Sequence, residues 1–140
     1  TPPTPDTRST PESPLTGLRV LVVDDETDMR DYLAFVLEQA GANVTIADSA
    51  ATVIALLPDL RPDLLISDIG MPQVDGYELL QQVRQLSDQR GGQTPAIALT
   101  AYVGEINQQQ AIAVGFQRHL SKPIEPDALI AAIREVLGID

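Results

Sequence analysis

The sequence predicts an α/β fold in which helices cover both faces of a parallel β-sheet. Short apolar, β-branched runs alternate along the chain with segments whose apolar residues recur at helical spacing, which is typical of βαβ units. The strand candidates are almost continuously apolar, as expected for strands buried on both faces. The length of 140 residues, 44% of them hydrophobic, suits one domain with a single core.

Five strands and five helices are expected to alternate. The strands are expected at residues 18–23, 43–47, 64–67, 96–100 and 119–121. The helices are expected at residues 28–40, 50–57, 77–85, 106–114 and 127–137. Gly41 is the expected stop of the first helix, and Ser49 is a candidate N-cap of the second. The last helix shows an apolar stripe with a period near 3.6 residues.

Right-handed crossovers between these strands would give a doubly wound, three-layer (βα)5 sandwich. The flavodoxin-like strand order 2-1-3-4-5 is a standard solution for a five-stranded sheet of this kind. Ligands of such folds bind beyond the carboxyl ends of the strands, near the point where the strand order switches. The residues that follow the strands are therefore the candidates for function.

Composition bounds the setting in which the domain works. Residues 1–16 contain five prolines among Thr and Ser and are expected to form a disordered linker, which leaves residues 17–140 as the folded domain. No apolar run approaches the length of a membrane span and no signal peptide is present, so we expect a cytoplasmic domain without membrane contact of its own. The net charge of -11 argues against direct nucleic-acid binding.

Polar side chains follow four of the expected strands. Asp24 and Asp25 follow the first strand, Asp68 the third, Thr100 the fourth and Lys122 the fifth. Each alone has a structural explanation, as a helix cap, a strand residue or a surface side chain. Three carboxylates that converge at neighbouring strand ends, however, repel one another strongly unless a cation is bound.

The available ligands are hard oxygens, because the chain has no Cys and no partnering His at these strand ends. They indicate Mg²⁺, with Mn²⁺ as an alternative. We expect Asp25 and Asp68 as carboxylate ligands, Asp24 acting through a bound water, and the backbone carbonyl of Gly70 as a further oxygen. A carboxylate can also attack a phosphoryl group while a metal neutralises the transferring oxygens, which is the role expected for Asp68.

Two further side chains complete the expected phosphoryl site. Lys122 is the only lysine of the chain, and its compact ammonium can pair with Asp68 or with a phosphoryl group. The hydroxyl of Thr100 can donate a hydrogen bond to another phosphoryl oxygen. Both groups would respond to modification of Asp68.

Four motifs carry a resemblance to a known family. VLVVDDE, LLISDIGMPQVDGYELL, AIALTAY and HLSKPIEP occur in the order and spacing of response-regulator receiver domains, and the resemblance covers roughly residues 18–138. It implies a role for each residue of the cluster: phosphoacceptor for Asp68, acid pair for Asp24 and Asp25, switch hydroxyl for Thr100 and phosphate-binding lysine for Lys122. It also implies a cis peptide bond between Lys122 and Pro123.

The resemblance implies how such a domain works. It takes a phosphoryl group from the phosphohistidine of a histidine kinase or phosphotransfer domain, catalyses its own phosphorylation and dephosphorylation, and has no independent metabolic activity. Phosphorylation then changes the conformation of the surface formed by the fourth helix, fifth strand and fifth helix. His119 holds the place of an aromatic ring that swings inward in the family, and both a switching and a purely structural role stay open. Gly70 and Tyr102 hold the places that tune hydrolysis of the acyl phosphate.

The setting of the domain admits several alternatives. The proline-rich start without Met and the end close behind the last helix favour the C-terminal receiver of a hybrid sensor histidine kinase, tethered through its linker to a membrane-bound kinase. A free-standing chemotaxis-type regulator is the nearest alternative, and a monomer or weak dimer is expected. A receiver-like module that never takes phosphate is a further class, against which Asp68, Thr100 and Lys122 argue.

Two enzyme classes fit the residues less well. A hydrolase of the haloacid dehalogenase type has a second Asp two residues after its nucleophile, where this chain has Gly70. A dinucleotide-binding enzyme needs a glycine-rich turn after the first strand, where this chain has DDETD, whose negative charge repels a pyrophosphate. The phosphoacceptor switch therefore remains the leading hypothesis.

Overall fold

The computed structural model describes residues 14–71, 73–101 and 108–139 and confirms the expected fold. Five parallel strands form one sheet in the order β2-β1-β3-β4-β5. The strands are β1 (Arg19–Val23), β2 (Asn43–Ala47), β3 (Leu64–Asp68), β4 (Ala96–Thr100) and β5 (Arg118–Ser121). Three expectations lie outside the described residues: the linker as far as residue 13, Tyr102, and the first two residues of the fourth helix.

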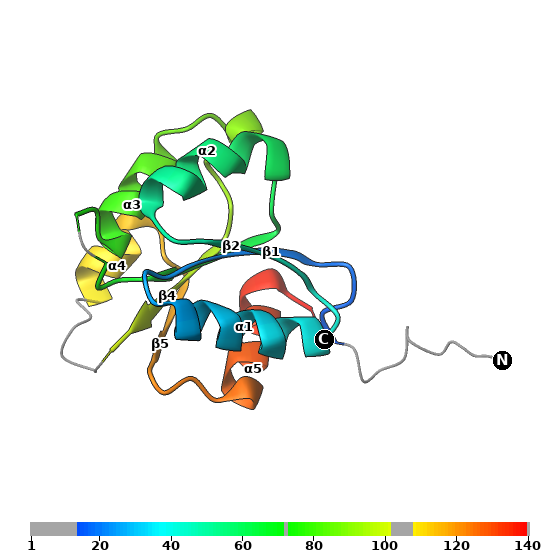
Figure 1. Ribbon diagram of the computed structural model, residues 1–140. Coiled ribbons are helices and arrows are strands. Elements are labelled where there is room, and N and C mark those ends of the chain that lie inside the picture. The colour runs from blue at the N-terminus through cyan, green and yellow to red at the C-terminus, as the bar shows by residue number, and fades with distance from the viewer. Residues whose placement is uncertain (1–13, 72, 102–107, 140) are drawn as a thin grey trace, which may run out of the picture.

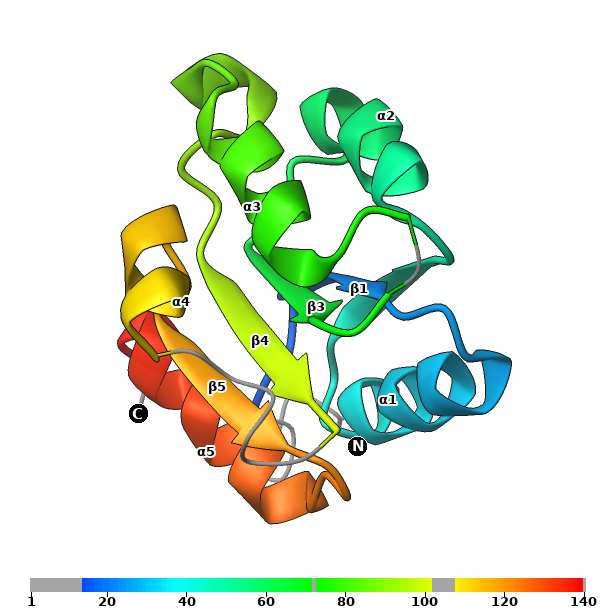
Figure 2. The ribbon, with the colours of Figure 1, turned by 90° about the vertical axis from the view of Figure 1, so that its left-hand side faces the viewer.

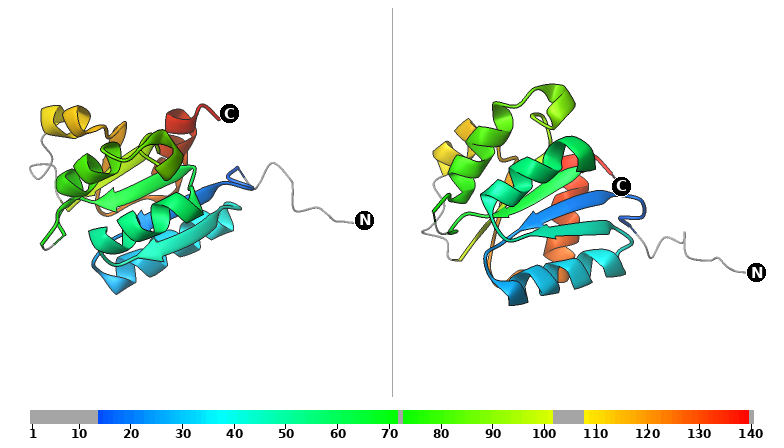
Figure 3. Two further views of the ribbon diagram at one scale, coloured as in Figure 1. Left: turned by 90° about the horizontal axis from the view of Figure 1, so that it is seen from above. Right: turned by 45° about the horizontal axis from the view of Figure 1, so that its top comes forward.

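Helices cover both faces of the sheet. They are α1 (Thr27–Gln39), α2 (Ala50–Leu60), α3 (Gly76–Arg84), α4 (Gln108–Val114) and α5 (Pro126–Leu137), with a short 3₁₀ helix, η2 (Asp88–Arg90), before β4. Figures 1 and 2 show α2, α3 and α4 on one face and α1 and α5 on the other, and Figure 3 shows the same layers from two further directions. Within the described ranges, no helix is long and apolar enough to cross a lipid bilayer.

The core is divided by the sheet into two halves. Successive side chains of a strand point to opposite faces, so Leu21 and Val23 pack under α2 and α3, whereas Val20 and Val22 pack against α1 and α5. Every residue of the central strands β3 and β4 is buried. Burial on both faces explains why these strands are apolar runs instead of alternating patterns.

Local chemistry sets the helix ends. Ser49 caps α2 as predicted, since its hydroxyl accepts the Thr52 N–H. The expected end of α2 at residue 57 is wrong, because the helix continues through Pro58 to Leu60. Proline lacks an N–H and its ring crowds the preceding turn, but the helix continues past Pro58, and Arg61 closes its end by donating its N–H to the Leu57 carbonyl at 3.0 Å.

Packing starts slightly before the expected domain boundary at residue 17. The side chain of Leu15 is fully buried in the half of the core shared with α1 and α5. The Leu15 N–H donates to the carbonyl of Ala40 at 2.8 Å, just beyond the end of α1. Leu15 therefore belongs to the folded domain and not to the linker.

Gly76 allows α3 to begin directly against the end of β3. Its N–H donates to the Ile69 carbonyl at 3.0 Å. A Cβ at this position would lie 2.6 Å from the carbonyl oxygen of Asp68 and 2.9 Å from the Cα of Ile69. Backbone atoms cannot rotate away as a flexible side chain can, so the close approach requires glycine.

We predict that Gly76→Ala lowers the free energy of unfolding by about 1–3 kcal/mol, because the new methyl group displaces α3 from the end of β3. Urea denaturation measures the change. Gln81→Ala, at an exposed position on the same helix, is the matched control and should stay within about 0.5 kcal/mol of the parent protein. Equal stability of Gly76→Ala and the parent would contradict the close approach.

Candidate functional site

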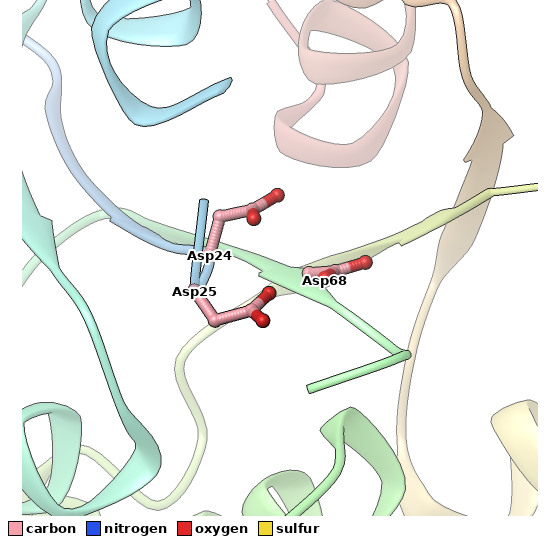
Figure 4. A group of neighbouring side chains, drawn as sticks. All are labelled: Asp24, Asp25 and Asp68. Carbon is pink, nitrogen blue, oxygen red and sulfur yellow. The ribbon is translucent and has the colours of Figure 1, made fainter. Parts of the chain in front are cut away.

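Three carboxylates gather beyond the ends of β1 and β3, which are neighbours in the sheet (Figure 4). Asp24 and Asp25 follow β1, and Asp68 is the last residue of β3. One carboxylate oxygen from each residue lies within 4.8 Å of the other two. Asp24 is 0% exposed and Asp68 is 5% exposed, whereas Asp25 is at the surface. The cluster predicted from the strand ends is therefore present.

The turn into α1 holds Asp24 in place. Its carboxylate accepts the backbone N–H of Glu26 at 2.9 Å, an arrangement in which a side chain closes a turn on its own backbone. The guanidinium of Arg30 donates to the backbone carbonyl of Asp24 at 2.8 Å. The start of α1 thus fixes the direction of this buried carboxylate.

Lys122 reaches the cluster from the end of β5. Its Nζ lies 3.2 Å from Oδ2 of Asp24 and 3.4 Å from Oδ1 of Asp68, with Oε1 of Glu26 at 4.0 Å. The Lys122 N–H donates to the Thr100 carbonyl at 2.7 Å, which continues the pairing of β4 with β5. The bond between Lys122 and Pro123 is cis, as the resemblance implies.

The charges of the cluster are only partly balanced. Burial, and secondly the charge of Asp24, raise the pKa of Asp68 to about 6, although Lys122 and the Gly70 N–H act in the opposite direction. Burial alone would lower the pKa of Lys122, but the charges of Asp68 and Asp24 outweigh it and raise that pKa. One ammonium faces three carboxylates, so the site favours a further positive charge.

The donor set fits Mg²⁺. It consists of carboxylate oxygens close enough together to share one ion, without sulfur or imidazole in the cluster. The exposed carboxylate of Asp25 gives an ion access from solvent, while Asp24 and Asp68 lie deeper.

Thr100 is the last residue of β4, the neighbour of β3 in the sheet, and His119 lies on β5 opposite Ala98. The hydroxyl of Thr100 is fully buried, and its single hydrogen has two acceptors within reach, the Leu120 carbonyl at 3.5 Å and Oγ of Ser121 at 3.4 Å. Both distances are at the long end for hydrogen bonds. His119 is half-buried and borders a hollow of about 220 Å³ between α4 and β5, which Ile112 also lines.

Three residues at the site were not anticipated from the sequence. Glu26 directly follows the acid pair Asp24 and Asp25 in the sequence, and this position alone could have predicted that it lies near Lys122. Arg30 lies in the first turns of α1 and its guanidinium contacts the backbone of Asp24. Helical spacing alone is weak evidence for this contact. Tyr32 donates its hydroxyl to the Ile124 carbonyl at 2.6 Å, and no local pattern connects residues 92 positions apart.

The chain matches the profile of the response regulator receiver domain over residues 20–134, a range that includes the whole cluster. It is 46% identical over 121 residues to an uncharacterised 14.6 kDa protein in the sodA1 3′ region of Leptolyngbya boryana, covering 86% of this chain and 91% of that protein. It is 33% identical to the probable histidine kinase 2 of Oryza sativa subsp. indica, covering 89% of this chain but only 13% of the kinase.

A solved structure supports the same relationship. The chemotaxis protein CheY4 of Vibrio cholerae superposes with a TM-score of 0.79 at 32% sequence identity. The match covers 86% of this chain and 98% of CheY4. The likeness therefore extends over the whole sheet and its helices and is not limited to the motifs around the carboxylates.

We predict that Asp68→Asn stabilises the metal-free domain above neutral pH. The pKa of Asp68 is about 6 in the folded state and near 3.8 in a free carboxyl, so the folded state binds the proton more tightly. This contribution is complete below about pH 4 and is lost as the pH rises through 6. In EDTA at about pH 7.5, the variant should unfold with a free energy about 1–3 kcal/mol above the parent, a difference that vanishes near pH 4.

Chemical denaturation across this pH range measures the difference, with exposed Asp31→Asn on α1 as the control. The control should track the parent protein at every pH. Addition of millimolar Mg²⁺ should then stabilise the parent more than Asp68→Asn, because the variant lacks one carboxylate. A variant that is less stable than the parent at about pH 7.5, with a deficit that shrinks towards pH 4, would show that the pKa of Asp68 is lowered and not raised.

Proposed function

The chain belongs to the response regulator receiver domain family, and on this premise we propose that Asp68 is the residue that accepts the phosphoryl group. Receiver domains are the phosphoacceptors of two-component systems, interact with histidine kinases or phosphotransfer proteins, and bind Mg²⁺ at an acidic cluster. The observation that carries the proposal is the carboxylate of Asp68, held between two other aspartates and the ammonium of Lys122, 3.4 Å away.

The surroundings of the three aspartates favour Asp68 over the other two. Asp24 is fully buried, and its two oxygens already accept from the Glu26 N–H at 2.9 Å and from Lys122 at 3.2 Å. Asp25 is exposed at the rim, and among the described residues it has no ion pair. Both contacts of Asp68 are made by Oδ1, which lies 3.4 Å from Nζ of Lys122 and 3.4 Å from the Gly70 N, so among the described contacts Oδ2 accepts no hydrogen bond and is able to react.

The reaction follows from the chemistry of these groups. An oxygen of ionised Asp68 attacks the phosphorus of a phosphohistidine; a P–O bond forms, the N–P bond breaks, and the imidazole leaves with the electron pair and takes up a proton. Lys122 balances the charge gathering at Asp68, and the Gly70 N–H orients the carboxylate. Bound Mg²⁺, or Mn²⁺, held by Asp25, Asp68 and the Gly70 carbonyl, with Asp24 acting through water, would neutralise the transferring oxygens.

We assign Thr100 and His119 to the switch that reads the modification. Both acceptors within reach of the Thr100 hydroxyl lie at long distances, so exchanging them for a charged phosphoryl oxygen is favourable. A displacement of Thr100 also changes its contacts with β5, because its hydroxyl lies against the Leu120 carbonyl and Ser121. His119 lies on the same strand beside a hollow that its ring can enter. The surface of α4, β5 and α5 would then change shape.

The proposal extends to the partners of the domain. The donor is a histidine kinase or phosphotransfer domain, carried either on the same polypeptide or on another one. A net charge of -11 supports a domain that does not itself contact nucleic acid. We propose that the domain acts in the cytoplasm, where a membrane-bound kinase can reach it. We also propose that it is a monomer or a weak dimer.

Phosphorylation at Asp68 is tested by intact-protein mass. Incubation with Mg²⁺ and a small phosphodonor such as acetyl phosphate should add one phosphoryl group to the parent protein, because an ionised carboxylate beside Lys122 is a competent nucleophile. Asp68→Asn should gain nothing, exposed Asp31→Asn should behave as the parent, and EDTA should abolish the gain.

Three outcomes would contradict the assignment in different ways. A gain of mass by Asp68→Asn would place the acceptor elsewhere. A parent protein that gains no mass under conditions that modify other receivers would indicate a module that never takes phosphate. Steady turnover of a phosphorylated metabolite would instead indicate a hydrolase.

The role of His119 has a direct spectroscopic test, because it is the only histidine of the chain. With Mg²⁺ and beryllofluoride, a phosphoryl mimic, the imidazole NMR signals of His119 should shift as the ring changes surroundings. Thr100→Val keeps the shape of the side chain but removes the hydroxyl, and should leave these signals nearly unmoved. Unshifted signals in the parent protein would make His119 a structural residue, and a full shift in Thr100→Val would remove Thr100 from the coupling.

A further inference from the structure

We propose that Tyr32 is a positioning residue for Lys122: its hydroxyl anchors the connection from β5 to α5, so that the Lys122 ammonium stays between Asp24 and Asp68. The inference rests on the role of Lys122 in the proposed function. It assigns a task to a residue of α1 that contributes no charge to the site. The hydroxyl of Tyr32 acts on the backbone that carries the lysine and not on the reacting atoms.

The contact is short and bridges distant parts of the chain. Oη of Tyr32 donates to the Ile124 carbonyl at 2.6 Å, near the lower limit for hydrogen bonds between oxygens. Ile124 lies two residues after Lys122, and its own side chain is buried in the core half that faces α1 and α5. A displacement of Ile124 therefore moves the backbone beside the lysine.

Hydrogen bonds to three different elements hold the backbone of residues 122–125. At its start, the Lys122 N–H donates to the Thr100 carbonyl at 2.7 Å, which ties it to β4. Near its middle, the Ile124 carbonyl accepts from Tyr32, which ties it to α1. The Glu125 carbonyl accepts the Leu129 N–H at 3.0 Å at the start of α5. Loss of the Tyr32 contact leaves no backbone hydrogen bond to α1 within residues 123–125 among the described contacts, so the backbone next to the lysine gains freedom.

The geometry of Lys122 makes it sensitive to this freedom. Its Nζ lies 3.2 Å from Asp24 and 3.4 Å from Asp68, distances at which a small displacement breaks a hydrogen bond. The lysine stem has several rotatable bonds and cannot by itself hold the ammonium between two carboxylates. Backbone placement must therefore supply the precision.

The exposure of Tyr32 favours the hydroxyl over the ring as the active part. The residue is 37% exposed and borders a shallow groove of about 510 Å³ shared with Met29 and Pro123. A ring in such a place contributes less to the core than a buried one. Arg30, on the same helix, likewise holds the backbone of Asp24 at 2.8 Å. Helix α1 thus supports the backbone beside both the buried aspartate and the lysine.

Tyr32→Phe removes the hydroxyl and keeps the ring. Because Lys122 is the only lysine, protein labelled with ¹³C,¹⁵N-lysine gives a single side-chain signal, whose ε-methylene shift and relaxation report the order of the ammonium. We expect a shifted and more mobile ε-methylene. Phosphorylation by acetyl phosphate at saturating Mg²⁺ should slow roughly three- to ten-fold, the effect of one hydrogen bond, while Mg²⁺ affinity stays unchanged.

Two comparisons separate positioning from general loss of structure. Phe35→Leu, an exposed position one turn further along α1, should leave both the lysine signal and the rate unchanged. In a Lys122→Ala background, Tyr32→Phe should have no additional effect on the rate, since the group that it positions is gone.

The inference fails if Tyr32→Phe leaves the lysine signal unaltered, or if it slows phosphorylation equally with and without Lys122. Absence of any phosphorylation in the parent protein would overturn the proposed function instead. The order of the Lys122 signal would even then decide whether Tyr32 positions the lysine.

Discussion

The mutual repulsion of three carboxylates is the constraint on which the rest of the site depends. Parallel strands bring their carboxyl ends to one edge, so Asp24, Asp25 and Asp68 lie within 4.8 Å by virtue of the fold itself. Lys122 and the Gly70 N–H offset part of this repulsion, but burial first, and then the charge of Asp24, still raise the pKa of Asp68 to about 6. The remaining imbalance makes the site receptive to a proton, to a divalent cation, or to a group that changes its charge.

The segments between the strands hold this cluster together. The start of α1 directs Asp24 through the Glu26 N–H, and the close approach at Gly76 packs α3 directly against the backbone of Asp68. The connection after β5 brings Lys122 across the sheet edge, with Tyr32 as its anchor. Strands provide the common edge, whereas helix starts and connections provide the precise placement of charge.

The sequence was sufficient for the features that depend on repeated or convergent patterns. Burial on both faces produces apolar runs, so all five strands and their order were predictable, and the convergence of strand ends made the acidic cluster predictable too. The end of α2 beyond Pro58 was not predictable, because whether a helix continues past a proline depends on the contacts that close the following turn. The burial of Leu15 and the bond from Tyr32 to Ile124 also escaped prediction, since both depend on tertiary packing that no local spacing encodes.

The packing of Leu15 against the end of α1 fixes where the described chain enters the domain. It places the entry of the chain at the amino end of β1, and α5, which begins next to the Lys122 connection, finishes at the same edge of the sheet (Figure 1). Strands of five residues separate this edge from the carboxylates by roughly 16 Å. The first and last described residues, 14 and 139, therefore lie at the edge of the sheet opposite the acidic cluster.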